Sequence, residues 1–237
     1  MRKLLKRLYR TFVPEPMPAC DADTIAVLTA RLQRHSCAID IGCNRGSILR
    51  EIVRLAPDGT HFAFEPIPRL FRLLCKRFPM VDCRRIALSD ETGTVTFNHF
   101  TQMDGFSGIV QRDVGTDPGR IEKITVDTER LDAIVPESAM VTLIKIDVEG
   151  AEYRVLRGAE NLLRRCRPTV IFECGKGGLD IYGHTPEQVY DLLTDCGLSI
   201  SRLAEWSQSS VPISRQAFVD EFWHGIEYMF VAGPSIA

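Results

Sequence analysis

Three acidic residues stand at the ends of short apolar segments, where a bound ligand could meet them. Asp40 lies two residues before Gly42, in a turn that closes at Gly46. Glu65 ends the next apolar segment, and Asp147 ends a later one. Glycines in such a turn let a ligand approach the backbone closely. In open α/β sheets, ligands bind in the crevice outside the carboxyl ends of the strands. The spacing therefore predicts a ligand site that these acids line.

The glycine turn favours a cationic ligand over a dinucleotide. Dinucleotide sites use G-x-G-x-x-G to seat a pyrophosphate on a helix N-terminus, whereas here Cys43, Asn44 and Arg45 separate the two glycines. Asp40 would also repel a pyrophosphate. S-adenosylmethionine carries an ammonium and a sulfonium, which a carboxylate attracts. Two alternatives stay open: an NAD-dependent oxidoreductase, and a purely structural Asp40 that accepts hydrogen bonds from backbone N–H groups.

A nucleoside would be recognised by the next two strand ends. Glu65 is placed to accept hydrogen bonds from a ribose diol, which serves NAD and S-adenosylmethionine equally. Backbone near Ala87 and the polar side chain of Ser89 would meet an adenine. The cofactor-binding residues that we predict are Asp40, Gly42, Asn44, Gly46, Glu65, Ala87, Ser89 and Asp147.

The elements that position these residues alternate between apolar segments and helical periodicity, which is typical of βα units on a mostly parallel sheet. We expect sheet strands at 37–41, 61–64, 81–88, 141–147, 169–173, 198–203 and 226–232. We expect helices at 23–34, 47–55, 69–78, 151–165 and 185–196. Residues 94–99 and 121–128 read as antiparallel strands around an irregular segment, 100–120, which we expect to be a functional loop.

Composition narrows the function further. The chain has 237 residues, 45% hydrophobic and 25% charged, with a net charge of −2, which excludes a disordered chain and a disulfide-stapled miniature fold. A balanced charge argues against nucleic acid as a partner. The eight cysteines form no C-x-x-C pair, so we expect reduced thiols and no metal site.

The first residues differ from the rest of the chain. Residues 1–12 are basic and amphipathic, but prolines replace the apolar core of a signal peptide, so we expect a cytoplasmic protein. This segment could contact the inner face of an anionic membrane weakly, or it could pack on its own domain. We therefore predict an extension at 1–22 and a single domain at 23–237.

Five motifs in order resemble the FkbM family of S-adenosylmethionine-dependent methyltransferases. They are IDIG at 39–42, FEP at 64–66, ALSDETG at 87–93, ITVDTERLD at 124–132 and LIKIDVEGAE at 143–152. The resemblance implies a Rossmann-like class I methyltransferase fold, with a mostly parallel seven-stranded sheet, an antiparallel last strand and helices on both faces. It also implies methylation of a hydroxyl on a sugar or other natural product. The pair Asn44 and Arg45 departs from the further glycine that many methyltransferases carry in this turn.

Methyl transfer needs an oxygen nucleophile aligned with the methyl carbon and a group that takes its proton. The candidate bases are Asp147, Glu149, Glu173 and His99, with His184 as a further loop histidine. The first three acids could instead hold a divalent cation, and Glu149 could simply favour a helix N-terminus. We expect a small-molecule or glycan acceptor that contacts the loop around Phe106. A non-catalytic S-adenosylmethionine-binding module remains the other alternative.

Overall fold

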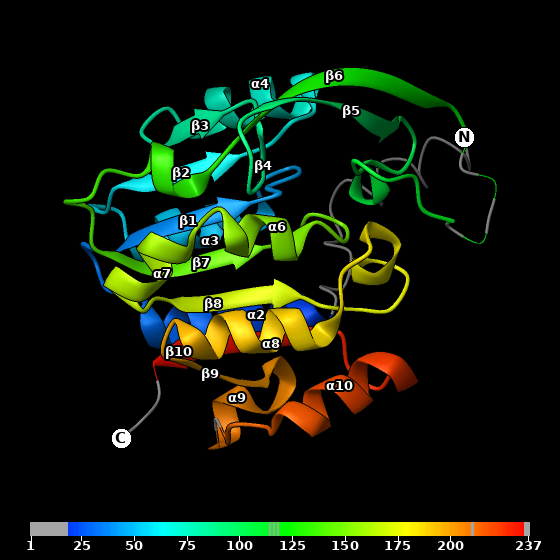
Figure 1. Cartoon of the computed structure of the whole chain (residues 1–237). Helices are drawn as coiled ribbons and strands as arrows, with labels where there is room; N and C mark the ends of the chain where they lie inside the picture. Colours follow the sequence, from blue (N-terminus) through cyan, green and yellow to red (C-terminus); the bar gives the residue numbers. More distant parts are fainter. Residues whose placement is uncertain (1–18, 114, 116, 118, 210, 235–237) are drawn as a thin grey trace, which may run out of the picture.

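The computed structural model describes residues 19–113, 115, 117, 119–209 and 211–234 (Figure 1). Its centre is a seven-stranded sheet in the order β3-β2-β1-β7-β8-β10-β9. All neighbouring strands pair in parallel except β10, which is antiparallel to both β8 and β9. The strands are β3 Asp82–Arg84, β2 His61–Phe64, β1 Cys37–Ile41, β7 Val141–Ile146, β8 Thr169–Glu173, β10 Met229–Pro234 and β9 Leu198–Arg202. This confirms the predicted fold class.

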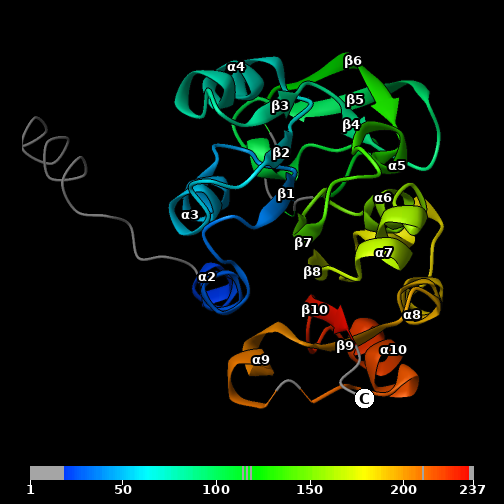
Figure 2. The same ribbon diagram turned by 90° about the vertical axis from the view of Figure 1, so that its left-hand side faces the viewer.

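Helices cover both faces of this sheet. Figure 2 shows them to either side of the strands. One face carries α2 Ala19–Arg31, α3 Ser47–Leu55, α4 Pro68–Arg77 and α9 Leu203–Ser209. The other carries α5 Leu131–Ile134, α6 Glu152–Arg157, α7 Glu160–Cys166, α8 Pro186–Asp195 and α10 Arg215–His224. Each face has its own buried apolar cluster, so both faces of the sheet are shielded from solvent. None of the helices within the described ranges combines the length and apolarity that crossing a membrane requires.

A second, three-stranded sheet is inserted between β3 and β7. It consists of β4 Ala87–Leu88, β6 Ile121–Glu129 and β5 Gly93–Phe100, in which β5 and β6 are antiparallel, as predicted. The expected single strand at 81–88 is wrong, because β4 leaves the main sheet and pairs with β6 instead. Between β5 and β6 the chain forms a short 3-10 helix, η1, at Asp104–Phe106. This segment, the end of β5 and the start of β6 overhang the carboxyl ends of the main strands (Figure 1).

The predicted helix at 151–165 is broken into α6 and α7. A Cβ on Gly158 would lie 2.1 Å from the carbonyl oxygen of Ser89, and the Gly158 carbonyl accepts a hydrogen bond from Asp132 N at 2.9 Å. The break thus lets the chain pack closely against the β4 exit. The sequence analysis also missed α9, α10 and the 3-10 helix η2 at Leu179–Tyr182. Ser214 caps α10, since its hydroxyl accepts from Ala217 N.

The predicted amphipathic segment at 1–12 lies outside the described residues, while α2 starts at Ala19, four residues before the predicted start.

Candidate active site

The glycine turn after β1 lies where the sheet order reverses, between β1 and β7, which is where open α/β sheets bind ligands. Gly42 has φ 75°, and a Cβ there would lie 1.8 Å from the carbonyl oxygen of Asp147. Its N–H donates to the Phe64 carbonyl at 3.0 Å, and Asp147 N donates to the Ile41 carbonyl at 3.1 Å. The backbones after β1, β2 and β7 therefore interlock at a point that only glycine fits.

Glu65 is held at the end of β2 by backbone donors. Its two oxygens accept hydrogen bonds from Asn44 N at 2.8 Å and Ile67 N at 2.9 Å. The side chain is buried, and burial raises the pKa of Glu65 to about 7, although the two N–H groups oppose the shift. Each carboxylate oxygen can accept more than one hydrogen bond, so the group can still receive a ligand hydroxyl.

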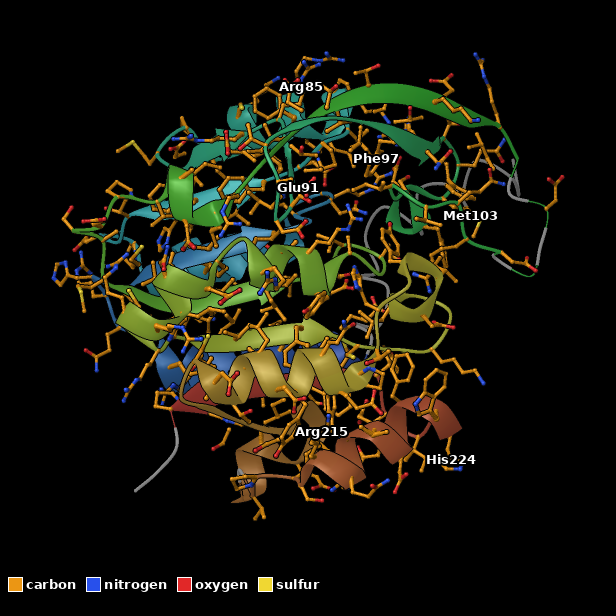
Figure 3. The ribbon with its side chains drawn as sticks, in the orientation of Figure 1. Arg85, Glu91, Phe97, Met103, Arg215 and His224 are labelled. Atoms are coloured by element: carbon orange, nitrogen blue, oxygen red, sulfur yellow. The ribbon has the colours of Figure 1, made fainter. Side chains whose placement is uncertain are left out.

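Glu65 lines a first cavity together with Gly42 and Asn44. Its walls are largely apolar and include Phe64, Ile67, Ile86, Leu88, Phe97 and Ile109. Figure 3 labels Phe97, which comes from β5 of the small sheet. A largely apolar cleft with the Glu65 carboxylate on its wall suits a nucleoside, whose base is flat and whose ribose donates hydrogen bonds.

A second cavity joins the first at the glycine turn. Gly42, Asn44, Asp147 and Glu149 line both cavities. Beyond them the second cavity is lined by Thr24, Ser47, Lys145, Glu173, Tyr228 and Met229. A ligand with its nucleoside in the first cavity would therefore extend past Asp147 and Glu149 into the second.

Asp147, Glu149 and Glu173 converge at this junction, with carboxylate oxygens within 4.8 Å of one another. Two cations balance them: Lys145 Nζ lies 3.2 Å from Asp147 Oδ2, and Arg112 forms an ion pair with Glu149. Burial, and then the charge of Glu173, raises the pKa of Glu149 to about 8. Burial, and then the charge of Asp147, raises the pKa of Glu173 to about 7. Near neutral pH the junction thus keeps a proton on part of its carboxyl groups.

The backbone that carries Glu149 is in an unusual conformation. Glu149 has φ 61° and Gly150 has φ 107°. A Cβ on Gly150 would lie 2.6 Å from the carbonyl oxygen of Gly178, so the turn is pressed against the loop after β8. Glu152 accepts a hydrogen bond from Val148 N at 2.9 Å, which fixes the start of α6. Strain of this kind persists only where surrounding packing imposes it, and it is common at functional sites.

Lys145 is a residue of the site that the sequence analysis missed. Its Nζ donates to the Gly42 carbonyl at 3.2 Å and lies 3.8 Å from Asp40 Oδ1. Burial alone would lower the pKa of Lys145, but the charges of Asp147 and Asp40 raise it above its ordinary value. The sequence feature that could have identified Lys145 is its position inside an otherwise apolar strand. Such a residue needs a buried anion, but the sequence does not say which one.

Asp40 is placed away from both cavities. It pairs in register with Lys145 across β1 and β7, so the two side chains share one face of the sheet. Neither carboxylate oxygen of Asp40 has a hydrogen-bond partner among the residues that the structure describes. Burial raises the pKa of Asp40, and the charge of Lys145 opposes this rise. Lys145 therefore stands between Asp40 and the second cavity.

The remaining predicted cofactor residues divide into two groups. Ala87 and Asn44 line the first cavity. Gly46 and Ser89 line neither cavity. A Cβ on Gly46 would lie 2.7 Å from the side chains of α4, so this glycine admits the packing of α3 on α4, and the buried hydroxyl of Ser89 bonds to its neighbour in the chain.

The candidate base His99 is buried and lies outside both cavities. Its Nε2 is 3.1 Å from Asp104 Oδ1, and Asp104 also pairs with Arg69. Asp104, Gly105, Ser107 and Ile109 line the first cavity, on the side of the small sheet. The loop that we expected at the acceptor thus borders the cavity that contains Glu65, and Figure 3 shows Met103 in the same overhang.

The fold is that of a class I methyltransferase. It combines a seven-stranded sheet in which only β10 is antiparallel with helices on both faces, and its cavities lie at the carboxyl ends of β1, β2 and β7. Residues 40–200 match the model of the methyltransferase FkbM domain. The chain belongs to the FkbM methyltransferase family, and it carries an S-adenosylmethionine-dependent methyltransferase domain.

Individual relatives agree with this assignment. The chain is 32% identical over 149 residues to the 2-O-methyltransferase NoeI of Sinorhizobium fredii, which covers 54% of this chain and 59% of NoeI. It is 26% identical over 211 residues to the methyltransferase sdnD of Sordaria araneosa, covering 75% and 80%. The crystal structure of methyltransferase FkbM from Methylobacillus flagellatus superimposes with a TM-score of 0.51 at 14% identity, over 85% of this chain and 44% of that one. The last comparison supports the fold alone.

Proposed function

We propose that the protein transfers the methyl group of S-adenosylmethionine to a hydroxyl oxygen of a carbohydrate or a similar polyhydroxylated natural product. The observation that carries the proposal is the convergence of Asp147, Glu149 and Glu173 where the two cavities meet. Carboxylates there can accept hydrogen bonds from hydroxyls. The similarity to NoeI, a 2-O-methyltransferase, supports oxygen as the methylated atom.

In this proposal the cofactor spans both cavities. Glu65 would accept hydrogen bonds from the ribose, and the apolar walls of the first cavity would enclose the adenine. The methionine tail would follow the Gly42 turn toward the N-terminus of α3, where Ser47 lines the second cavity. Asp147 and Glu149 would then face the sulfonium, whose positive charge complements the net negative charge of the junction.

The bound cofactor supplies an electrophilic methyl carbon, and the protein must hold and deprotonate the acceptor hydroxyl. Glu173 is the best placed base, because a group with a pKa of about 7 is largely deprotonated just above neutral pH and still accepts a proton well. Asp147 would orient that hydroxyl, with Lys145 holding the carboxylate in place. Glu149 already binds Arg112, which leaves it less available as a base.

The test is methyl transfer from isotopically labelled S-adenosylmethionine to a panel of neutral sugars, polyols and amines. The proposal predicts labelled products with alkali-stable ether linkages on hydroxylated acceptors. Glu173→Gln should lower kcat at least about 100-fold, the scale of general base catalysis, while S-adenosylhomocysteine still binds. Glu91→Gln is the matched control, since Glu91, which is labelled in Figure 3, is exposed and lines neither cavity. Label found only on amines would contradict O-methylation, and binding without any transfer would favour the non-catalytic module.

A further inference from the structure

Four exposed side chains lie on or next to the segments that line the second cavity. They are Lys176 in the loop after β8, Trp223 at the end of α10, and Ile226 and Tyr228 in the segment that leads into β10. The exposed fractions are 43% for Trp223, 71% for Ile226 and 51% for Tyr228. We refer to these four residues as the aromatic rim. Large apolar side chains clustered at the mouth of a cavity are typical of a binding surface.

The aromatic rim is fixed to the candidate catalytic residues by the backbone. Met229 pairs with Glu173 across β10 and β8, and Cys174 N donates to the Tyr228 carbonyl at 2.8 Å. Tyr228 itself lines the second cavity together with Glu173. The rim is therefore continuous with the proposed reaction site. Figure 3 shows His224, the neighbour of Trp223, on the side of the molecule to which the carboxyl end of β8 points.

Trp223 contacts two neighbouring side chains although it is partly exposed. The buried ring of Phe222 meets the Trp223 ring edge-on, with ring centroids 4.9 Å apart and an interplanar angle of 89°. Lys176 Nζ lies 5.9 Å from the centroid of the Trp223 ring, which is within cation–π distance. A partly exposed indole with an ammonium donor over its ring offers both an apolar contact and a hydrogen bond. The apolar C–H face of a pyranose and its ring of hydroxyls match this combination.

The charges at the inner end of the rim favour a neutral ligand. Lys145 and Arg112 balance two of the three junction carboxylates, and the raised pKa values of Glu149 and Glu173 allow a proton to reduce the remaining charge. In the proposed function the sulfonium of the cofactor complements the remaining negative charge, so a cationic acceptor would find little net attraction once the cofactor is bound. A stable protein–protein interface buries about 1,200 Å² or more of surface, which three apolar side chains alone do not provide.

We propose that the aromatic rim is a carbohydrate-binding subsite that holds a sugar ring of the acceptor at the mouth of the second cavity. The inference rests on the proposed O-methyltransferase function and assigns the acceptor side of that site. In it, the ring stacks on Trp223 and Tyr228, Lys176 donates to its hydroxyls, and the hydroxyl to be methylated extends inward to Glu173.

The two tryptophans of the chain make this directly measurable. Trp206 lies on α9, over the opposite face of the sheet, so Trp206→Phe leaves Trp223 as the sole reporter. Cellotetraose, chitotetraose and maltotetraose would be titrated into this variant with and without S-adenosylhomocysteine. We expect at least one of them to change the Trp223 emission saturably, and Tyr228→Ala to weaken that response at least about 10-fold.

The reciprocal variant, Trp223→Phe, keeps Trp206 and should show no response to any of the three oligosaccharides. An equal response in Trp223→Phe would overturn the subsite, as would no response in Trp206→Phe. A response to anionic phospholipid vesicles in place of the sugars would also overturn it. Calorimetric binding of S-adenosylhomocysteine to Trp206→Phe and Trp223→Phe tests the proposed function separately, because neither tryptophan lines either cavity.

Discussion

Replacing Lys145 with methionine should destabilise the protein strongly, and more at high pH than at low pH. Methionine fills a similar volume but leaves Asp40 buried without its only nearby cation among the described residues. The carboxylate of Asp40 then destabilises the folded protein, since an uncompensated buried charge lowers the free energy of unfolding. Asp147 is affected less, because its side chain is 41% exposed and water can solvate it.

The size of the effect follows from the distance. Two unit charges 3.8 Å apart attract by about 4 kcal/mol at an effective dielectric constant of about 20. Removing one partner of a buried ion pair typically lowers stability by about 3–5 kcal/mol, which agrees with this Coulomb energy. Total stabilities of domains are roughly 5–15 kcal/mol, so Lys145→Met should remove a large part of the free energy of unfolding.

The pH dependence has a definite sign. Burial already raises the pKa of Asp40, and loss of Lys145 raises it further. The folded variant then binds a proton more tightly than the unfolded chain, so its stability falls as pH increases above the unfolded value of 3.8. The deficit relative to wild type should therefore be larger at pH 8 than at pH 5.

Urea unfolding of wild type, Lys145→Met and the double variant Asp40→Asn/Lys145→Met at both pH values measures this directly. The double variant should recover most of the loss, since it leaves no unpaired buried charge at position 40. Lys123→Met, on an exposed position of β6, is the control and should change stability by less than about 0.5 kcal/mol. A deficit that is equal at both pH values and is not rescued by Asp40→Asn would refute this reasoning.

Three further predictions concern the junction. Gly42→Ala should abolish tight binding of S-adenosylhomocysteine in calorimetry, because its Cβ would lie 1.8 Å from the Asp147 carbonyl; unchanged affinity would contradict the interlocked turn. The methylation rate should rise with pH through about 7, as Glu173 loses its proton, and a rate independent of pH from 5 to 9 would exclude Glu173 as the base. Chelation with EDTA should leave the rate unchanged, because Lys145 and Arg112 already supply cations to the acids; loss of activity that Mg²⁺ restores would show a metal site instead.

The sequence predicted the sheet well where a strand is a short apolar segment between turn residues. β1, β2 and β8 match their predicted bounds, because burial on both faces demands a continuous apolar segment. The break between α6 and α7 could not be predicted in the same way. Helical periodicity continues through Gly158, and the break depends on a contact with Ser89, which is remote in the chain.

The site was predicted unevenly for the same reason. Glu65, Asp147 and the Gly42 turn follow from local patterns at strand ends, and the structure places them on the cavities. Asp40 has the same local pattern, but its register opposite Lys145 turns it into a buried counter-ion. The convergence of Glu149 and Glu173 with Asp147 depends on the strand order, which no single motif specifies.

Calorimetric titration of the full chain with S-adenosylhomocysteine and with NAD tests the central claim most directly. We expect S-adenosylhomocysteine to bind at one site per chain and NAD not to bind. Glu65→Ala should weaken the affinity at least about 100-fold, since hydrogen bonds to a charged group contribute about 1.5–3 kcal/mol each. Binding of NAD alone, or equal affinity in wild type and Glu65→Ala, would contradict the account.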